Sequence, residues 1–178
     1  MSDAVLIAAV LLVLVLIYAL MRVMKPDRPE PKVPRTRRTT PTTPLDPDKF
    51  IVVDGSNVMH WGGEPLAFVL NQVLVALDKK GLIPIIYFDA NVGYKLWGRY
   101  ADAQTIAPKI GVKPHRVNVV PSGVVADEVL LSFAVESGIR VVTNDRFLDW
   151  RVQYPRAAEK GFLVKGTWRE GSVMLRGV

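Results

Sequence analysis

The sequence of 178 residues contains no cysteine. Disulfide scaffolds, zinc sites built on thiolates and cysteine nucleophiles are therefore excluded. Its two histidines, His60 and His115, do not have the spacing of metal ligands. A glycine-rich phosphate loop is also missing, because Gly55 stands alone after the first apolar run. This absence argues against a dinucleotide-binding fold.

Excess charge is small and proline is scarce outside one stretch. The net charge is +6, which favours anionic partners only mildly. Seven of the 13 prolines lie between Lys25 and Lys49. The chain therefore divides into an apolar start (residues 1–23), a proline-rich and threonine-rich basic segment (residues 24–48) and residues 49–178. The last part has ordinary globular composition and the length of one domain.

The first segment predicts a transmembrane anchor. Residues 4–21 form a run of 18 without charge, twelve of them Leu, Ile or Val, which gives roughly 27 Å of helix. A cleaved signal peptide would have a basic start and small residues at the cleavage site, and both are missing. Basic residues follow the run, so we expect a single-pass protein with its N-terminus outside and its C-terminal domain in the cytoplasm.

Residues 24–48 predict a disordered tether. They have almost no large apolar side chains and cannot bury enough surface to become ordered. In polyproline form they would reach at most about 75 Å from the membrane. The tether would hold the domain near the membrane without setting its orientation.

Strand and helix patterns alternate along residues 49–178. Short apolar runs predict buried strands, and apolar residues at helical spacing predict helices. Strands are expected at residues 50–53, 83–88, 117–120 and 139–142, and helices at residues 66–77, 94–107 and 127–137. This alternation predicts an α/β fold of three layers, α/β/α, with a mainly parallel central sheet.

Aspartates follow the predicted strands. Asp54, Asp89 and Asp145 each stand at the carboxyl end of a strand, and Asp127 opens the helix after the third. Ligands of open parallel sheets bind at this edge. Carboxylates gathered there repel one another unless a cation lies between them, and their oxygens suit Mg²⁺ or Mn²⁺. Each acid alone is also explained as a turn or helix-capping residue, but their recurrence at one edge favours a metal site.

Three short motifs occur in a distinctive order: Val53-Asp54-Gly55-Ser56-Asn57-Val58, then Ala126-Asp127-Glu128, then Val142-Thr143-Asn144-Asp145. Together they resemble the NYN and PIN-like ribonucleases over residues 50–165, and residues 126–150 are most similar to the Regnase-type branch. The resemblance implies a metal-dependent nuclease with Asp54, Asp127 and Asp145 as motif acids and Asn57 as the polar residue after the first acid. Asp149 also falls where that branch tends to carry an acid.

The sequence departs from this branch at one position. Regnase-type members commonly carry two successive aspartates where this chain has Ala126-Asp127-Glu128. One carboxylate is therefore missing or replaced by Glu128 on a different helical face. Asp89 is the candidate to compensate. A CCCH zinc finger, another feature of the branch, needs cysteine and is excluded within this sequence.

Phosphodiester hydrolysis requires an activated water and neutralisation of the phosphate charge, and carboxylate-bound Mg²⁺ or Mn²⁺ provides both. We assign Asp54, Asp127 and Asp145 to the metal. Further candidate ligands are Asp89, Asp149 and Glu128. Asn57 is expected to orient a water or a phosphate oxygen.

Other polar residues near the same edge are candidates for RNA contact. The small ones, which are also common capping residues, are Ser56, Thr143 and Asn144. The basic ones, which are also explained as solvated surface, are Lys95, Arg99, Arg146 and Arg151. Trp61, Trp97 and Trp150 either stack on unpaired bases or anchor the core.

The predicted function is that of a membrane-anchored ribonuclease acting on single-stranded or structured RNA, with a protein partner or a second copy as further possible contacts. A phosphohydrolase of the haloacid type would need a second aspartate where Ser56 stands. The alternative that stays open is a degenerate PIN-like module that binds RNA or a protein at the membrane. The missing aspartate and the modest charge favour that alternative.

Overall fold

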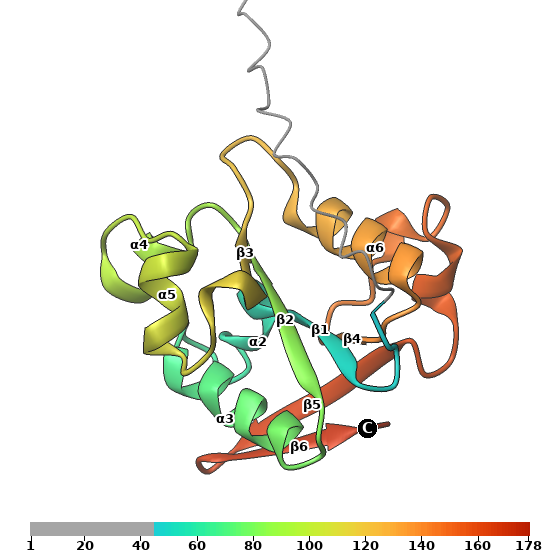
Figure 1. Cartoon of the computed structure of the whole chain (residues 1–178), viewed down its shortest axis with the longest axis horizontal. Coiled ribbons are helices and arrows are strands. Elements are labelled where there is room, and N and C mark those ends of the chain that lie inside the picture. The colour runs from blue at the N-terminus through green and yellow to red at the C-terminus, as the bar shows by residue number, and fades with distance from the viewer. Residues whose placement is uncertain (1–44) are drawn as a thin grey trace, which may run out of the picture. The chain divides into compact units, whose positions relative to one another are not determined.

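The computed structural model describes residues 45–178 (Figure 1). The predicted anchor at residues 4–21 and most of the predicted tether lie outside this range. Within residues 45–178, no helix combines the length and the apolar character needed to cross a membrane.

Six strands form one sheet in the order β3-β2-β1-β4-β5-β6. Their bounds are Phe50–Asp54 (β1), Ile83–Phe88 (β2), Val117–Val119 (β3), Val141–Val142 (β4), Leu163–Arg169 (β5) and Ser172–Arg176 (β6). The first five are parallel to their neighbours, and β6 pairs antiparallel with β5. The prediction of a mixed α/β fold with a mainly parallel sheet is confirmed.

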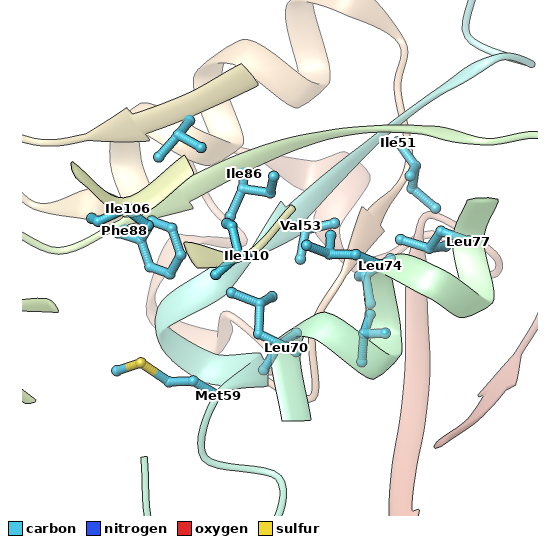
Figure 2. Packing of buried hydrophobic residues seen from close by; sticks show 14 of the residues in the cluster. Ile51, Val53, Met59, Leu70, Leu74, Leu77, Ile86, Phe88, Ile106 and Ile110 are labelled. Carbon is cyan, nitrogen blue, oxygen red and sulfur yellow. The ribbon is translucent and has the colours of Figure 1, made fainter. Parts of the chain in front are cut away.

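Helices cover both faces of the sheet. One face carries α2 (Gly55–Val58), α3 (Ala67–Asp78), α4 (Val92–Trp97) and α5 (Ala103–Lys109), and the other carries α6 (Ala126–Ser137). Side chains of β1 alternate between them: Ile51 and Val53 join the first hydrophobic cluster and Val52 the second, all with no exposed surface. Figure 2 shows the first cluster, in which leucines of α3 pack beneath β1 and β2. Burial of β1 on both faces fixes the position of Asp54 at its end.

The prediction of one helix over residues 94–107 was wrong. Gly98 ends α4 in the left-handed conformation with φ +67°, and Asp102 caps α5 by accepting hydrogen bonds from the backbone N and the hydroxyl of Thr105. The spacing of apolar residues continues across the break, so periodicity alone merged two helices. A glycine C-cap and an aspartate N-cap separate them.

The fourth strand is shorter than predicted because its first residues complete the preceding helix. The backbone N of Ile139 donates to Ala134 O (2.9 Å) beyond Gly138, which has φ +71°. This is a Schellman-type helix end. Strands β5 and β6 were not predicted; they meet in a two-residue turn at Glu170 and Gly171, where φ is +49° and +80°.

The remaining elements are short 3₁₀ turns. They are η1 (Pro114–Arg116), η2 (Leu148–Trp150) and η3 (Pro155–Ala158). Leu45, Trp150 and Tyr154 pack against the second cluster, which includes Phe147 and Ala157. The packed part of the domain therefore includes Leu45, four residues before the predicted start at residue 49.

Candidate active site at the carboxyl edge of the sheet

The predicted acids gather where β1, β2 and β4 end. Asp54 is the last residue of β1, Asp89 follows β2, and Asp145 lies three residues after β4. Asp127, in the first turn of α6, approaches from the second face. Charge interactions connect them: Asp127 and Asp89 raise the pKa of Asp54, and Asp145 and Asp89 raise the pKa of Asp127. Three of these acids follow β1, β2 and β4 at the carboxyl edge of the sheet, and Asp127 lies at the start of α6.

Asp54 is the most buried of the four, with 7% of its surface exposed. One carboxylate oxygen accepts a hydrogen bond from the backbone N of Asn57 (3.0 Å) and the other from the Thr143 hydroxyl (2.9 Å). Burial first, and then the charges of Asp127 and Asp89, raise the pKa of Asp54 to about 7 against the lowering effect of these two hydrogen bonds. The protein thus orients the Asp54 side chain but disfavours its ionised form.

Thr143 links the first and last motifs. It has no exposed surface, and its hydroxyl both donates to Asp54 Oδ2 and accepts from the backbone N of Asp145 (3.0 Å). The Asp145 carboxylate in turn accepts from the backbone N of Phe147 (2.7 Å), whose φ of +47° is uncommon for a bulky residue. Thr143 therefore orients two acids rather than presenting its hydroxyl to solvent.

Asn57 and Asn144 tie α2 and the loop after β4 to strand β5. Asn57 Oδ1 accepts hydrogen bonds from Trp61 Nε1 and from the backbone N of Asn144, both at 2.9 Å. The Asn144 amide pairs with the backbone of Gly166 in both directions, at 2.9 and 3.1 Å. A Cβ at Gly166 would overlap the Trp61 ring, so the close fit requires glycine. Both asparagines act mainly as braces of the loop that carries Asp145.

The second strand is tied to the same site. Ser56 Oγ accepts a hydrogen bond from the backbone N of Asp89 (2.9 Å), which is a structural contact. Lys95 Nζ lies 3.9 Å from Asp89 Oδ2, with both side chains more than a third exposed. The ion pair is weak, and it leaves Lys95 at the edge of the site.

Asp127 is half-buried and receives a hydrogen bond from the Trp150 side chain. Burial raises its pKa, the neighbouring charges of Asp145 and Asp89 raise it further, and the Trp150 bond lowers it. Trp150 also packs against the second hydrophobic cluster. It anchors η2 beneath Asp127 and is not free to stack on a base.

The donor set suits a divalent cation that keeps part of its water shell. Across residues 45–178, no three His, Asp or Glu side chains converge closely enough to hold a metal ion directly. Yet the four carboxylates repel one another, and a cation would relieve that repulsion. Mg²⁺ is commonly bound through one or two carboxylates and several waters. Carboxylate oxygens are hard donors of the kind that such an ion prefers.

Two predicted acids and one predicted base lie apart from this group. Glu128 and Asp149 are exposed, and the charges acting on Asp54 and Asp127 come from Asp89, Asp127 and Asp145. Arg99 is exposed in the connection between α4 and α5. Within residues 45–178, none of these three residues forms a hydrogen bond or an ion pair with the gathered carboxylates.

Three basic side chains flank the site on the β5 side, and one of them was not predicted from the sequence. Lys165 Nζ donates to the backbone O of Asp145 (2.7 Å). Burial lowers the pKa of Lys165; Asp145 opposes this effect, and Arg146 and Arg151 add to it, so the three cations lie near one another. Lys165 was not recognisable from the sequence as a site residue because β5 itself was not predicted. Arg146 and Arg151 fall where the sequence placed possible phosphate contacts.

Comparisons with known proteins agree with this geometry. Residues 47–176 match the family described as the Zc3h12a-like ribonuclease NYN domain. The fold is similar to the Arabidopsis thaliana nuclear protein-only RNase P 2 (PRORP2), with a TM-score of 0.57 and 19% identity over 72% of this chain and 30% of that chain. A second PRORP2 structure gives a TM-score of 0.52 and 19% identity, covering 72% and 29%. No curated protein matches.

At 19% identity the likeness to PRORP2 concerns the fold, and this chain spans less than a third of the plant protein. The family match is of a different kind, because it covers well over half of the chain and includes all of β1 to β6. It also contains every carboxylate gathered at the sheet edge. The chain belongs to the Zc3h12a-like ribonuclease NYN domain family.

Proposed function

We propose that this protein is a metal-dependent ribonuclease that hydrolyses RNA phosphodiester bonds at the carboxyl edge of its sheet. The observation that carries the proposal is the group of four interacting carboxylates, with Asp54 buried and oriented through both oxygens. Asp54, Asp127 and Asp145 would hold Mg²⁺ or Mn²⁺ partly through the ion's own waters, with Asp89 as a further ligand. When bound, the ion would neutralise charge on the scissile phosphate and acidify a water.

The chain's own residues supply orientation and charge. Through one hydroxyl, Thr143 orients the Asp54 carboxylate and holds the backbone of Asp145. Asn57, Asn144 and Gly166 brace the loop that carries Asp145. Pre-set ligands of this kind reduce the reorganisation that accompanies the reaction. Lys165 and Arg146, beside Asp145, would bind backbone phosphates of the RNA.

The full chain would act at a membrane. The uncharged run at residues 4–21 and the basic residues after it support a single-pass anchor with the catalytic domain on the cytoplasmic side. Tethering would confine cleavage to RNA that reaches the membrane. A protein partner or a second copy could bring such RNA to the site.

One observation favours a second candidate, a non-catalytic module that binds RNA or a protein. Both Asp54 oxygens already accept hydrogen bonds, and Ala126 stands where related domains carry another acid. In that case the carboxylates would repel one another without a compensating ion. The two candidate functions predict different effects of added metal and of substitutions at the carboxylates.

The test uses the full chain in detergent with a labelled single-stranded RNA. Mg²⁺ or Mn²⁺ should support cleavage, EDTA should abolish it, and Asp127→Asn should lower the rate by roughly two orders of magnitude or more. Asp78→Asn is the matched control, because Asp78 ends α3 at the opposite edge of the sheet and is exposed. Equal activity of wild type and Asp127→Asn would refute the proposed site. Absence of both cleavage and metal binding would favour the binding module.

A further inference from the structure

A cleft of about 620 Å³ opens beside Asp89, outside the group of carboxylates. Its volume lies within the range of small-molecule sites. It is lined by the residues after β2, by α4 and the start of α5, and by the residues after β3, namely Ala90, Asn91, Tyr94, Tyr100, Asp102, Ala103, Val119, Val120, Pro121 and Ser122. All these segments follow carboxyl ends of strands, so the cleft lies at the same edge of the sheet as the acids.

The two tyrosines of the cleft have open rings. Tyr94 is 60% exposed and Tyr100 is 66% exposed, and neither contacts another aromatic ring in residues 45–178. Exposed aromatic faces beside a nucleic-acid site are stacking platforms, because every base has a π-face. The tryptophans near the edge are not available for this role. Trp61 packs over Gly166, Trp97 lies under Lys109, and Trp150 is bonded to Asp127.

The tyrosines are held in place by the backbone around them. A Cβ at Gly93 would overlap the backbone of Arg99 and Ala101, so the segment that carries Tyr100 presses directly onto α4. Gly98, with φ +67°, turns the chain between the two tyrosines. Asp102 then caps α5. A cleft built in this way loses little conformational entropy on binding.

Charge in the cleft selects a base rather than a phosphate. The Thr105 hydroxyl and backbone N lower the pKa of Asp102, which lines the cleft and is an anion at neutral pH. An anion repels phosphate but accepts hydrogen bonds from the amino and imino groups of bases. Asn91 and Ser122 offer further donors and acceptors. The remaining lining is mostly apolar, as a base requires.

The order of the strands shows where the cleft lies relative to the carboxylates. Along the edge, the cleft lies at β2 and β3, the acids lie at β2, β1 and β4, and Lys165 lies on β5. A strand of RNA that crosses from the cleft to Lys165, Arg146 and Arg151 passes over the acids. We propose that the cleft holds one unpaired nucleobase of the RNA, close to the bond that is cut, against Tyr94 and Tyr100. The inference rests on the proposed ribonuclease function and narrows its substrate to RNA that is single-stranded at this position.

The first measurement is binding without cleavage. A fluorescein-labelled single-stranded RNA of ten nucleotides is titrated with the full chain in EDTA, and Kd is read from anisotropy. Tyr94→Ala and Tyr100→Ala should each raise Kd about tenfold to a hundredfold, the range expected for loss of one stacked base. Tyr94→Phe and Tyr100→Phe keep the ring and should bind as the wild type does. Phe68→Ala is the matched control, since Phe68 is 57% exposed but lies on α3, outside the cleft.

The second measurement identifies the base. Each nucleotide of the same RNA is replaced in turn by an abasic one, in wild type and in Tyr94→Ala. At one position, the abasic nucleotide should weaken binding to the wild type strongly and binding to Tyr94→Ala only slightly. The abasic nucleotide and the Tyr94→Ala substitution would then remove the same contact. In Mg²⁺, the cut should fall within about two nucleotides of that position, given the short span of the edge.

The outcomes separate this inference from the function on which it rests. Metal-dependent cleavage with tyrosine variants that bind as tightly as wild type would overturn the cleft and leave the ribonuclease in place. Tyrosine-dependent binding without any cleavage would refute the ribonuclease and keep a base-binding cleft. An equal loss of affinity at every abasic position would overturn the inference. A loss of affinity in Phe68→Ala as large as in the tyrosine variants would overturn it as well.

Discussion

Two opposing effects act on the Asp54 side chain. Its position at the end of a strand buried on both faces keeps it out of water, while Asn57 and Thr143 hold it for a ligand. Burial and the charges of Asp127 and Asp89 raise its pKa to about 7. An ionised Asp54 therefore destabilises the fold unless a cation is bound, which is a recurrent feature of functional carboxylates.

This conflict predicts a pH-dependent gain in stability for Asp54→Asn. Between the unfolded pKa, near 3.9, and the folded pKa of about 7, the native state binds more protons than the unfolded state. The free energy of unfolding of the wild type should therefore fall as pH rises through this window. Asparagine at position 54 keeps the shape of the aspartate side chain but carries no charge. We expect equal stability near pH 4 and an advantage of roughly 2–4 kcal/mol for the variant at pH 8.

Urea unfolding in EDTA from pH 4 to 8 measures this difference. Asp127, Asp89 and Lys165 interact electrostatically with Asp54. Because these three residues are present in both proteins, the comparison isolates the charge of Asp54. Added Mg²⁺ should stabilise the wild type and not the variant. A difference in stability that does not change with pH would contradict the assigned origin of the raised pKa.

At the scale of elements, strand β5 braces the loop of Asp145 although it contributes no acid. Gly166 exchanges two hydrogen bonds with the Asn144 amide and lies against the Trp61 ring. Lys165 adds a bond to the backbone of Asp145. The C-terminal hairpin is therefore part of the site's support as well as of the sheet.

Gly166→Ala should damage this support. The new methyl would overlap the Trp61 ring, which must move and release its bond to Asn57. We expect a loss of activity of about tenfold to a hundredfold, the usual cost of disturbing residues that orient metal ligands, and a destabilisation of about 1–3 kcal/mol. Initial rates in Mg²⁺ and thermal unfolding check the two effects. A variant with wild-type rates would show that Asp145 does not depend on this brace.

At the scale of the whole molecule, residues 45–178 contain a hydrophobic cluster on each face of the sheet and should fold alone. We expect a protein that lacks residues 1–44 to be soluble and to unfold cooperatively in a circular dichroism melt. Leu45 packs against the second cluster, so Leu45→Ser in this shortened protein should lower Tm by a few degrees, as loss of about 1 kcal/mol does. Aggregation of the shortened protein would show that the domain needs the preceding residues.

The second prediction at this scale concerns topology. A reporter fused after Val178 should behave as cytoplasmic, because basic residues follow the uncharged run at residues 4–21. Moving that positive charge to the start of the chain, by adding four lysines after Met1 and replacing Arg22, Lys25 and Arg28 with Gln, should invert the signal in part of the molecules. An extracytoplasmic signal from the unaltered chain would contradict the proposed orientation.

The sequence by itself determined the strands that carry the acids. Runs such as residues 50–53 and 83–88 are apolar on both sides because parallel strands are buried on both faces, and this signal is local. The order of Asp54, Asp127 and Asp145 then indicated the family. Both signals depend only on residues that are neighbours along the chain.

The tertiary structure decided which polar residues act as braces and which remain open to a ligand. From the sequence, Thr143 and Asn144 were expected to contact RNA, and Asn57 was expected to orient a water or a phosphate oxygen. In the structure, these three side chains form hydrogen bonds with residues 22 to 89 positions away and brace the segments that carry Asp54 and Asp145. The open aromatic faces belong to Tyr94 and Tyr100 because Gly98 splits a helix that periodicity had merged. Burial and hydrogen-bond partners are set by which strands become neighbours, and that information is not local.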